Sequence, residues 1–464
     1  MKAPLFYRPN SLQTPKQAER GVTMVLVALC MLTIIGMAAL SIDVVTLYLA
    51  REEAQRAADA AALAGARMIS LSGITTTADP ANSTPDWQLI CGGATSVASI
   101  AAQAAGQQNA VANSTPTVSI TYSARGATPG TANCTSLPTA FAINPTVIAT
   151  ITNSNLPTLF SRIWSRNVNS VSATAAAEVL NPSNSGSITT SGDAIQVVPH
   201  CVKPWIIPNL DPGTGAPFVN AATGAIQRLG IQPAAPNGFV GEGFTLQAAC
   251  KTGATDCNPA KGDLPHNPPL AGSYVPALVT VNPVAIPACS VASLFQQAIG
   301  GCDPSTGVQS TAYQCGIPNG SNADLTFNPG GSGGDTAVAG QCLIHQTANG
   351  LLQGQDSLDP TVYPYKMFSG SQNPILPSAN TQLITASNSV VSVPIYDQTA
   401  GPLTTTQPQV TILGFLQVFI DSVDSTTGNV NLHVLNVAGC GNDASTTALA
   451  PGPSPVPIRL ITSQ

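Results

Sequence analysis

The sequence carries very little charge for its length of 464 residues. Asp, Glu, Lys and Arg together make up 8% of it, whereas about a quarter is usual in soluble domains. The net charge is −6 and no basic cluster occurs, which argues against a nucleic-acid-binding surface. Ser, Thr, Asn, Gly and Pro are abundant instead. This composition is typical of an exported protein rich in strands and turns.

The sequence also lacks the patterns of a metal, phosphate or paired-carboxylate site. Cys342 and His345 form a C-x2-H pair, and His200 adjoins Cys201, but a zinc site needs four converging ligands and oxidised cysteines cannot bind the metal. The glycine-rich segment 328–335 is not followed by the Lys of a phosphate-binding loop. We therefore predict no catalytic, cofactor-binding or metal-binding residues, no small-molecule substrate and no enzyme activity.

One alternative to this prediction is a serine hydrolase. The segment GGSGG at 330–334 satisfies the G-x-S-x-G pattern with Ser332 as the nucleophile, and Asp421 and His433 could complete the set. Such a nucleophile needs a strand before it and a helix after it. Asn328 and Pro329 break the preceding strand, and the segment DTAVAG that follows is short. A glycine-rich surface loop is the preferred interpretation.

Cysteine usage agrees with export. Of eleven cysteines, Cys30 lies within an apolar run and ten lie outside it. An even number in a charge-poor chain indicates disulfides formed in an oxidising compartment. Spacing favours two local pairs, Cys250–Cys257 and Cys302–Cys315, because each flanks a turn segment with glycine. Connectivity does not follow from sequence, and buried free thiols remain the alternative.

An uncharged apolar run extends from Gly21 to Ile42. As a helix it would be roughly 33 Å long, enough to cross a bilayer core of about 30 Å. Four basic residues precede it against one acid, Glu19, which predicts a cytoplasmic N-terminus and an external remainder. A cleaved signal peptide is the alternative, but its apolar region would be shorter. We expect Asp43, at the outer end of the span, to be solvated.

The helix is predicted to continue through an alanine-rich segment, REEAQRAADAAALAGAR, at 51–67. Glu52, Arg56 and Asp59 give it one charged face. The other face carries only small side chains. Its burial gains little free energy from apolar surface, but small residues let another backbone approach closely. An exposed alanine-rich helix is the alternative. The predicted helix-packing residues are Ala54, Ala57, Ala58, Ala61, Ala62 and Gly65.

These residues carry a family resemblance. Glu19–Arg67 resembles the N-terminal region of Flp pilus-assembly TadE/TadG-like proteins, which have a basic arm, a Gly, one span ending in Asp, an aromatic residue and an "LxxRxxxQxAADAAALAGA" signature. Here Arg20, Gly21, Asp43, Tyr48 and the segment 55–64 match. The position at which prepilins have Glu is Leu26, so we do not expect processing at Gly21.

A second stretch, Thr146–Val179, resembles the strand, "PTFFxR" and "SAxAxA" pattern of the same family, through Pro157, Phe160, Arg162 and the alternating residues that follow. The metal motif D-x-S-x-S of the TadG-type von Willebrand region is absent. The resemblance implies a bacterial inner-membrane protein whose partners are other pilus-assembly proteins or like helices.

Further along the chain, alternating residues predict strands at 118–121, 147–151 and 168–179, and helices are expected at 95–110 and 290–301. Two strands around a turn are expected in 410–437. The predicted fold is α+β: a transmembrane helix, an alanine-rich extension, a small membrane-proximal α+β unit and a β-rich disulfide-containing exterior domain. The expected boundaries are 1–20 (cytoplasmic arm), 21–43 (span), 44–70 (helical extension), 71–180 (proximal unit), 181–194 (linker) and 195–464 (exterior domain).

The function predicted from these observations is a membrane-anchored structural or assembly component of a Tad-type pilus or related secretion apparatus. Its helix would pack with partner helices in a pilin-like way, and its exterior domain would make protein contacts. The alternative is an anchored extracytoplasmic adhesin or binding module unrelated to pili.

Overall fold

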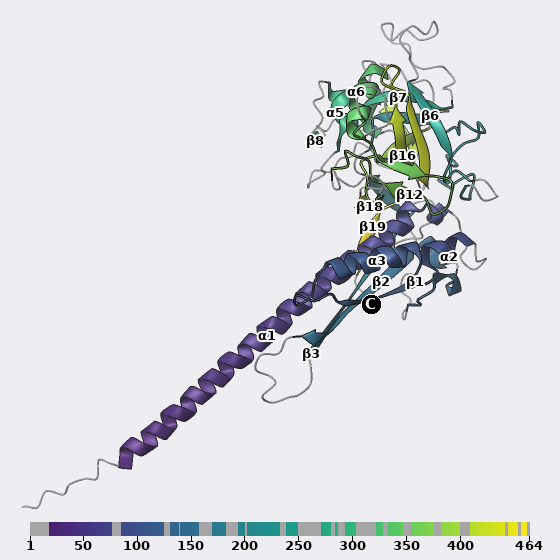
Figure 1. Ribbon diagram of the computed structural model, residues 1–464. Helices are drawn as coiled ribbons and strands as arrows, with labels where there is room; N and C mark the ends of the chain where they lie inside the picture. Colours follow the sequence, from purple (N-terminus) through teal and green to yellow (C-terminus); the bar gives the residue numbers. More distant parts are fainter. Residues whose placement is uncertain are drawn as a thin grey trace, which may run out of the picture.

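The computed structural model describes most of the chain. The described residues are 18–76, 85–124, 130–138, 140–156, 169–181, 194–199, 202–232, 238–248, 271–279, 284–285, 293–302, 322–327, 333–346, 354–374, 382–399, 409–440, 444–452 and 456–461. They form a long N-terminal helix, a small unit packed along its second half, and a larger domain at its far end (Figure 1).

The helix α1 runs without interruption from Ala18 to Leu71 over 54 residues, which corresponds to roughly 80 Å. No proline occurs in it, and alanine and leucine favour the helical state throughout. It ends where Ser72 turns back to the Ile69 carbonyl and Gly73 takes a φ of +72°. The predicted continuation of the span into the alanine-rich segment is confirmed as one element.

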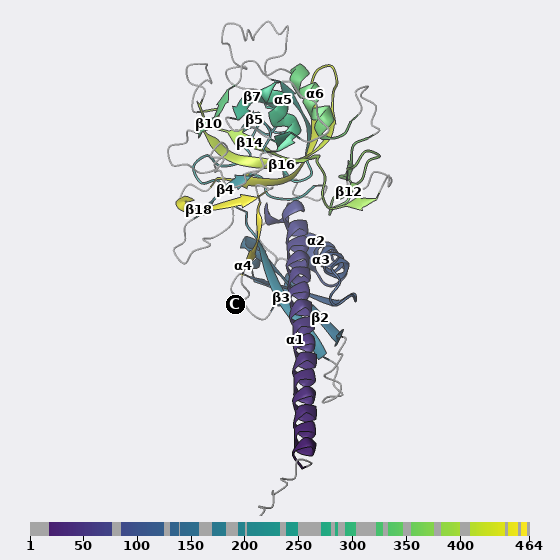
Figure 2. The same ribbon diagram turned by 90° about the vertical axis from the view of Figure 1, so that its left-hand side faces the viewer.

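A four-stranded antiparallel sheet lies beside the second half of α1 (Figure 2). Its order is β1 (Thr117–Ala124), β2 (Pro145–Leu156), β3 (Asn169–Val179) and β19 (Ile458–Ile461). Val118, Ile120 and Tyr122 face the helices together with Val147 and Ile151, whereas the opposite face is lined by Thr and Ser. The alternation predicted for the first three strands is therefore confirmed.

Short helices complete this proximal unit. α2 (Pro85–Cys91) and α3 (Val97–Gln108) share the α1 side of the sheet, and α4 (Ala140–Ile143) precedes β2. Two 3-10 turns, η1 (Ile74–Thr76) and η2 (Cys134–Ser136), connect the elements. The helix predicted at 95–110 corresponds to α3.

The larger domain is a barrel. Its eight-stranded sheet has the order β15-β10-β7-β5-β14-β16-β17-β6, and a further pairing of β6 with β7 closes a ring of six strands. The strands are β5 (Trp205–Pro208), β6 (Gly243–Ala248), β7 (Ser273–Val279), β10 (Asn322–Phe327), β14 (Val390–Tyr396), β15 (Gln409–Val410), β16 (Ile412–Val423) and β17 (Val430–Gly439). The expected pair of strands in 410–437 is the hairpin β16–β17.

The remaining elements surround the barrel. They are the helices α5 (Leu294–Gly300) and α6 (Gly333–Leu343), the sheet β11 (Ser357–Asp359), β12 (Lys366–Phe368) and β13 (Leu383–Ile384), and the pairs β4 (Ala194–Pro199) with β18 (Ala444–Gly452) and β8 (Val284–Ala285) with β9 (Gly301–Cys302). The helix expected at 290–301 corresponds to α5.

The chain leaves the proximal sheet after β3, builds the barrel, and returns. Its last described strand, β19, pairs antiparallel with β3, with Arg459 opposite Glu178. The division along the chain predicted from composition assigned 458–461 to the exterior domain, whereas strand pairing puts these residues in the proximal sheet. Composition predicts a linker at 181–194, most of which lies outside the described residues, but it carries no sign of the return of the chain to the proximal sheet.

Candidate functional site: the membrane helix and its junction with the barrel

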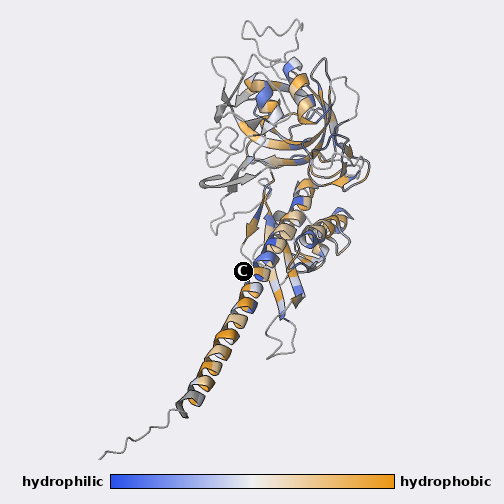
Figure 3. Ribbon diagram, turned by 60° about the vertical axis from the view of Figure 1, so that its left-hand side comes forward, coloured by the Kyte–Doolittle hydropathy of each residue, from blue (hydrophilic) through white to orange (hydrophobic). Residues whose placement is uncertain are grey.

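The first half of α1 is exposed and apolar. From Val22 to Leu49 its large side chains are about half exposed or more, except Leu47, which is partly buried, and this part is coloured as hydrophobic in Figure 3. The helix from Gly21 to Leu71 is long and apolar enough to cross a membrane, with a mean hydropathy of 2.6 in its most apolar window. This segment therefore fits a single membrane span.

The second half of α1 is covered by the rest of the chain. Ala54, Ala57, Ala58, Ala61, Ala62 and Ala66 have no exposed surface. A Cβ on Gly65 would lie 2.9 Å from Cγ1 of Val147 on β2 and 3.3 Å from Cβ of Ala102 on α3. The six predicted packing residues thus lie against a helix and the sheet of the same chain, and their burial requires no partner helix.

The small side chains have a geometric reason. α3 crosses α1 so closely that a Cβ on Gly106 would lie 3.3 Å from Cβ of Ala61, and 2.9 Å from Cγ2 of Val118 on the sheet. Helix axes separated by larger residues pack about 8–10 Å apart. Alanine and glycine at these positions let both helices contact the same sheet face. The segment 51–67 therefore forms the surface of α1 on which the proximal unit packs.

Asp43 differs from expectation. It is 4% exposed, although it was expected to be solvated. Ala39, one turn before it, is 6% exposed. The rest of the chain therefore covers one side of α1 from Ala39 toward the C-terminal end of the helix. An isolated helix would leave a carboxylate there solvated.

The end of α1 is embedded in the barrel domain. Ser70 donates to the Val456 carbonyl, and Asn436 of β17 donates to the Ser70 carbonyl at 2.6 Å. Asn181 binds Thr75 and the Val437 carbonyl. One hydrophobic core contains Ile69 and Ile74 together with Val240 and Ala438 of the barrel domain. The helix and the barrel are therefore coupled through both polar and apolar contacts.

The returning strand strengthens this junction. Glu178 on β3 has a fully buried side chain and pairs with the guanidinium of Arg459 on β19. The Pro457 carbonyl accepts from the Leu180 amide at 3.0 Å. The C-terminal strand thus connects the exit of the chain from the proximal sheet to its return.

A disulfide joins Cys91 at the end of α2 to Cys134 in η2. Both cysteines are buried beside Trp87, whose ring centroid lies 5.4 Å from that of Phe141. Cys342 is in a disulfide, and so is Cys440, and Cys30 is free and exposed in the described part of α1. Cys250, Cys257 and Cys315 lie outside the described residues, so the two pairs inferred from spacing stay predictions.

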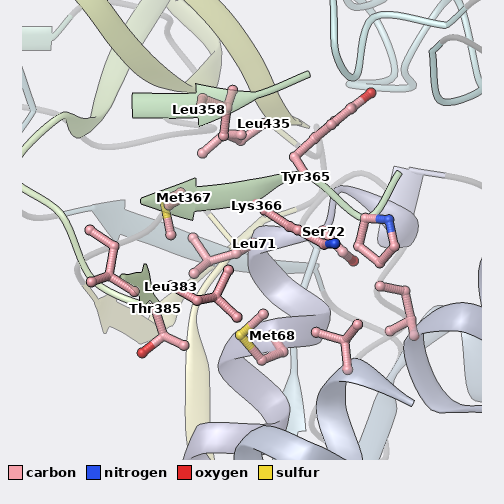
Figure 4. A pocket seen from close by; sticks show the side chains of 14 residues that line it. Met68, Leu71, Ser72, Leu358, Tyr365, Lys366, Met367, Leu383, Thr385 and Leu435 are labelled. Carbon is pink, nitrogen blue, oxygen red and sulfur yellow. The ribbon is translucent and has the colours of Figure 1, made fainter. Parts of the chain in front are cut away.

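An apolar groove of about 110 Å³ lies at the junction. Met68, Leu71, Leu383 and Leu435 line it, and Figure 4 also shows four side chains with polar groups along it, those of Ser72, Tyr365, Lys366 and Thr385. The groove separates the end of α1 from the small sheet β11–β13. The residues that line it include no Asp, Glu or His.

Two of the three residues of the serine hydrolase alternative, Asp421 and His433, lie in the described part of the chain. Asp421 and His433 do meet, with Oδ2 and Nδ1 2.7 Å apart. β10 ends at Phe327, before Asn328 and Pro329, which were expected to break the strand. The segment DTAVAG, expected to be short, is instead part of the eleven-residue α6, which begins at Gly333 within GGSGG. Ser332 itself lies outside the described residues.

His433 and α6 lie on opposite faces of the barrel sheet. α6 packs through Ala339 and Leu343 on the core that contains Leu432. His433, the next residue on β17, points to the opposite face, where it pairs with Phe419 and Gly243. The histidine and the helix that begins at Gly333 therefore lie on different sides of the sheet.

The possible metal ligands are engaged elsewhere. Cys342 is in a disulfide, and Nε2 of His345 lies 2.9 Å from Nδ2 of Asn388. Within the described ranges no three His, Cys, Asp or Glu residues gather as metal ligands would. His200 and Cys201 lie outside those ranges.

The chain was also compared with known proteins. Residues 21–68 match the family model of putative Flp pilus-assembly TadE/G-like proteins. This segment is the resemblance that the span and alanine signature indicated, and it is confirmed there. No curated protein and no solved structure matches the chain.

The TadE/G-like match covers about a tenth of the chain and coincides with the part of α1 that contains the candidate membrane span and the face on which the proximal unit packs. It supports an involvement in Flp pilus assembly and membrane association through one helix. The second resemblance, at 146–179, lies beyond the match and stays a prediction.

Proposed function

We propose that the chain is a membrane-anchored structural component of a Tad-type pilus or related secretion assembly. Its N-terminal arm lies in the cytoplasm, α1 crosses the bacterial inner membrane once, and the proximal unit and barrel lie outside. In this role the continuous helix α1 holds the barrel at a fixed distance from the membrane, where the barrel contacts other assembly proteins.

The observation that carries this proposal is the division of α1 into two halves. The TadE/G-like match covers both the exposed apolar half and the alanine-rich half that is buried against α3, β2 and β3. Because the helix is continuous from Ala18 to Leu71 and Ile69 near its end shares a hydrophobic core with Val240 and Ala438 of the barrel domain, a displacement of the barrel is transmitted directly to the span.

A non-enzymatic role is part of the proposal. It is supported by the placement of His433 and α6 on opposite faces of the barrel sheet and by the involvement of Cys342 in a disulfide. Purified full-length protein tested against short-chain esters would show no hydrolysis beyond that of a Ser332→Ala variant. Activity that disappears in Ser332→Ala would overturn this part.

The assembly role is tested by deleting the gene in the source bacterium and counting surface pili by electron microscopy. We expect pili to be lost and to be restored by the wild-type chain. Chemical crosslinking in membranes should connect the restored protein to other pilus-assembly proteins. Normal pili with defective surface attachment would contradict the assembly role and favour an anchored adhesin.

A matched pair of variants distinguishes the membrane-spanning half of α1 from the half that packs against the proximal unit. Gly36→Leu adds bulk where nothing lies within 4 Å, whereas Gly65→Leu adds it against Val147 and Ala102. Both leave the helix apolar and membrane-inserted. We expect Gly36→Leu to restore pili and Gly65→Leu to fail, because only the second separates the proximal unit from α1.

A further inference from the structure

The exposed apolar surface of α1 is longer than a bilayer requires. A core of about 30 Å is crossed by about 20 helical residues, so a span that begins at Gly21 ends near Leu40. Large apolar side chains nevertheless stay exposed beyond that point: Val44, Val45, Tyr48 and Leu49 are 50–63% exposed. These four residues form two further turns of apolar helix.

A second observation places the upper limit of the lipid. Ala39 and Asp43 are covered by the rest of the chain, at 6% and 4% exposure. Lipid cannot surround α1 at a level where the protein itself occupies one side, and a carboxylate is costly in hydrocarbon. Both observations put the outer edge of the bilayer core close to Ala39, so Val44–Leu49 lie above it.

The exposed residues form one stripe. Successive helical residues are about 100° apart, so Val45, Tyr48 and Glu52 lie opposite Ala39, Asp43 and Ala50, which face the proximal unit. Val44 and Leu49 form the two edges of the stripe. The Tyr48 hydroxyl lies near the Glu52 carboxylate, which raises the pKa of Tyr48, and Arg56 is exposed one turn above. Exposed apolar surface of this kind, bordered by charges, is typical of interaction sites.

We propose that the stripe formed by Val44, Val45, Tyr48 and Leu49 is the contact between two copies of this chain that stand side by side in one membrane. The proposal rests on the membrane anchoring of the proposed function. A partner must carry apolar surface at the same height above the bilayer, and a second copy does so because both chains are inserted in the same direction. Glu52 of one copy then lies near Arg56 of the other, which gives the pair complementary charges.

The test uses the full chain in vesicles made from native lipids, with donor and acceptor dyes on the N-terminal arms of separate copies. Energy transfer at high dilution in lipid measures the dimer. The double variant Val45→Glu/Tyr48→Glu places charge in the stripe and should weaken association about tenfold or more, since two apolar side chains lose their burial. Val362→Glu is the matched control, because Val362 is 60% exposed on the distant barrel domain.

A second set of variants tests the charge pairing without apolar change. Glu52→Arg should weaken the dimer, and Glu52→Arg/Arg56→Glu should restore it. Monomeric wild-type protein, or equal transfer in the double variant and wild type, would overturn the proposal. Failure of the double variant to insert, measured by alkaline extraction, would also overturn it, because the stripe would then lie in lipid. Pili are counted in parallel: a dimer without a role in pili would contradict only the proposed function.

Discussion

Gly65 of α1 and Val147 of β2 are in such close contact that a Cβ on Gly65 would lie 2.9 Å from Cγ1 of Val147. This separation is shorter than side chains tolerate, and Ala102 blocks the adjacent direction at 3.3 Å. The proximal unit can therefore pack this closely on α1 only because position 65 carries no side chain.

The first prediction concerns this contact. Gly65→Leu should lower the free energy of unfolding of the proximal unit by about 1–3 kcal/mol or more, because over-packing forces backbone shifts. Denaturant unfolding of the purified protein, followed by Trp87 fluorescence, measures the change. Gly36→Leu, in open space on the same helix, should leave the midpoint unaltered; an equal loss in both variants would contradict the packing argument.

The second prediction concerns the disulfide between Cys91 and Cys134, which closes a segment with a sequence separation of 43. Replacing both cysteines with alanine should destabilise the proximal unit by about 3–4 kcal/mol, mainly because the unfolded chain gains freedom. Thermal melting with and without a reducing agent measures it. The double variant should no longer respond to the reducing agent in this transition, whereas the barrel transition should still respond through Cys342 and Cys440.

The third prediction concerns the returning strand. Arg459→Met removes the partner of the buried Glu178 carboxylate and should cost about 1–3 kcal/mol. Hydrogen exchange should then show faster exchange in β3 as well as in β19, because the two strands are paired. Arg459→Lys, which keeps a cation, should lose less. Unchanged protection of β3 would mean that β19 is not part of the proximal sheet in solution.

The fourth prediction concerns Lys203, which is 1% exposed and donates from Nζ to the Ile299 and Gly301 carbonyls at 2.7 Å. It thereby satisfies carbonyls at the end of α5. Burial lowers the pKa of Lys203 from 10.5 to about 7. Between these two values the unfolded chain binds the extra proton, so the free energy of unfolding should increase as the pH rises from about 7 to 10.5.

Lys203→Met isolates this effect. The variant should lose the Lys203 contribution to the pH dependence above pH 7, which urea unfolding at a series of pH values detects. Lys366→Met, at an exposed lysine on β12, is the control and should retain the wild-type slope. Identical slopes in wild type and Lys203→Met would show that Lys203 is solvated in the folded protein.

Part of the candidate site was predictable from sequence because its residues are local. The span, the alanine face and the family resemblance all lie within Glu19–Arg67, and helical periodicity relates these residues without knowledge of the rest. What covers the alanine face was not predictable: Ala102 and Val147 are distant in sequence, and a smooth helix face fits a partner helix as well as a neighbouring sheet.

The strand β19 and the helix α6 show the same limit. Nothing in the composition of 458–461 distinguishes an edge strand of the proximal sheet from one of the barrel. The segment DTAVAG, which lies within α6, was expected to be short, and the glycine-rich segment before it to be a surface loop. Tertiary packing stabilises α6, since Thr336, Ala337 and Ala339 are buried on the barrel core and Gln341 donates to the Val423 carbonyl.

By itself the sequence determined that this chain has one uncharged span, a charge-poor exterior and an alanine-rich helix that permits close packing, since composition and helical period are properties of neighbouring residues. Only the tertiary structure decided that the close packing occurs within the chain, that Asp43 is buried, and that the last strand returns to the first sheet. These depend on contacts between residues far apart along the chain, whose free energy is gained only when the whole fold brings them together.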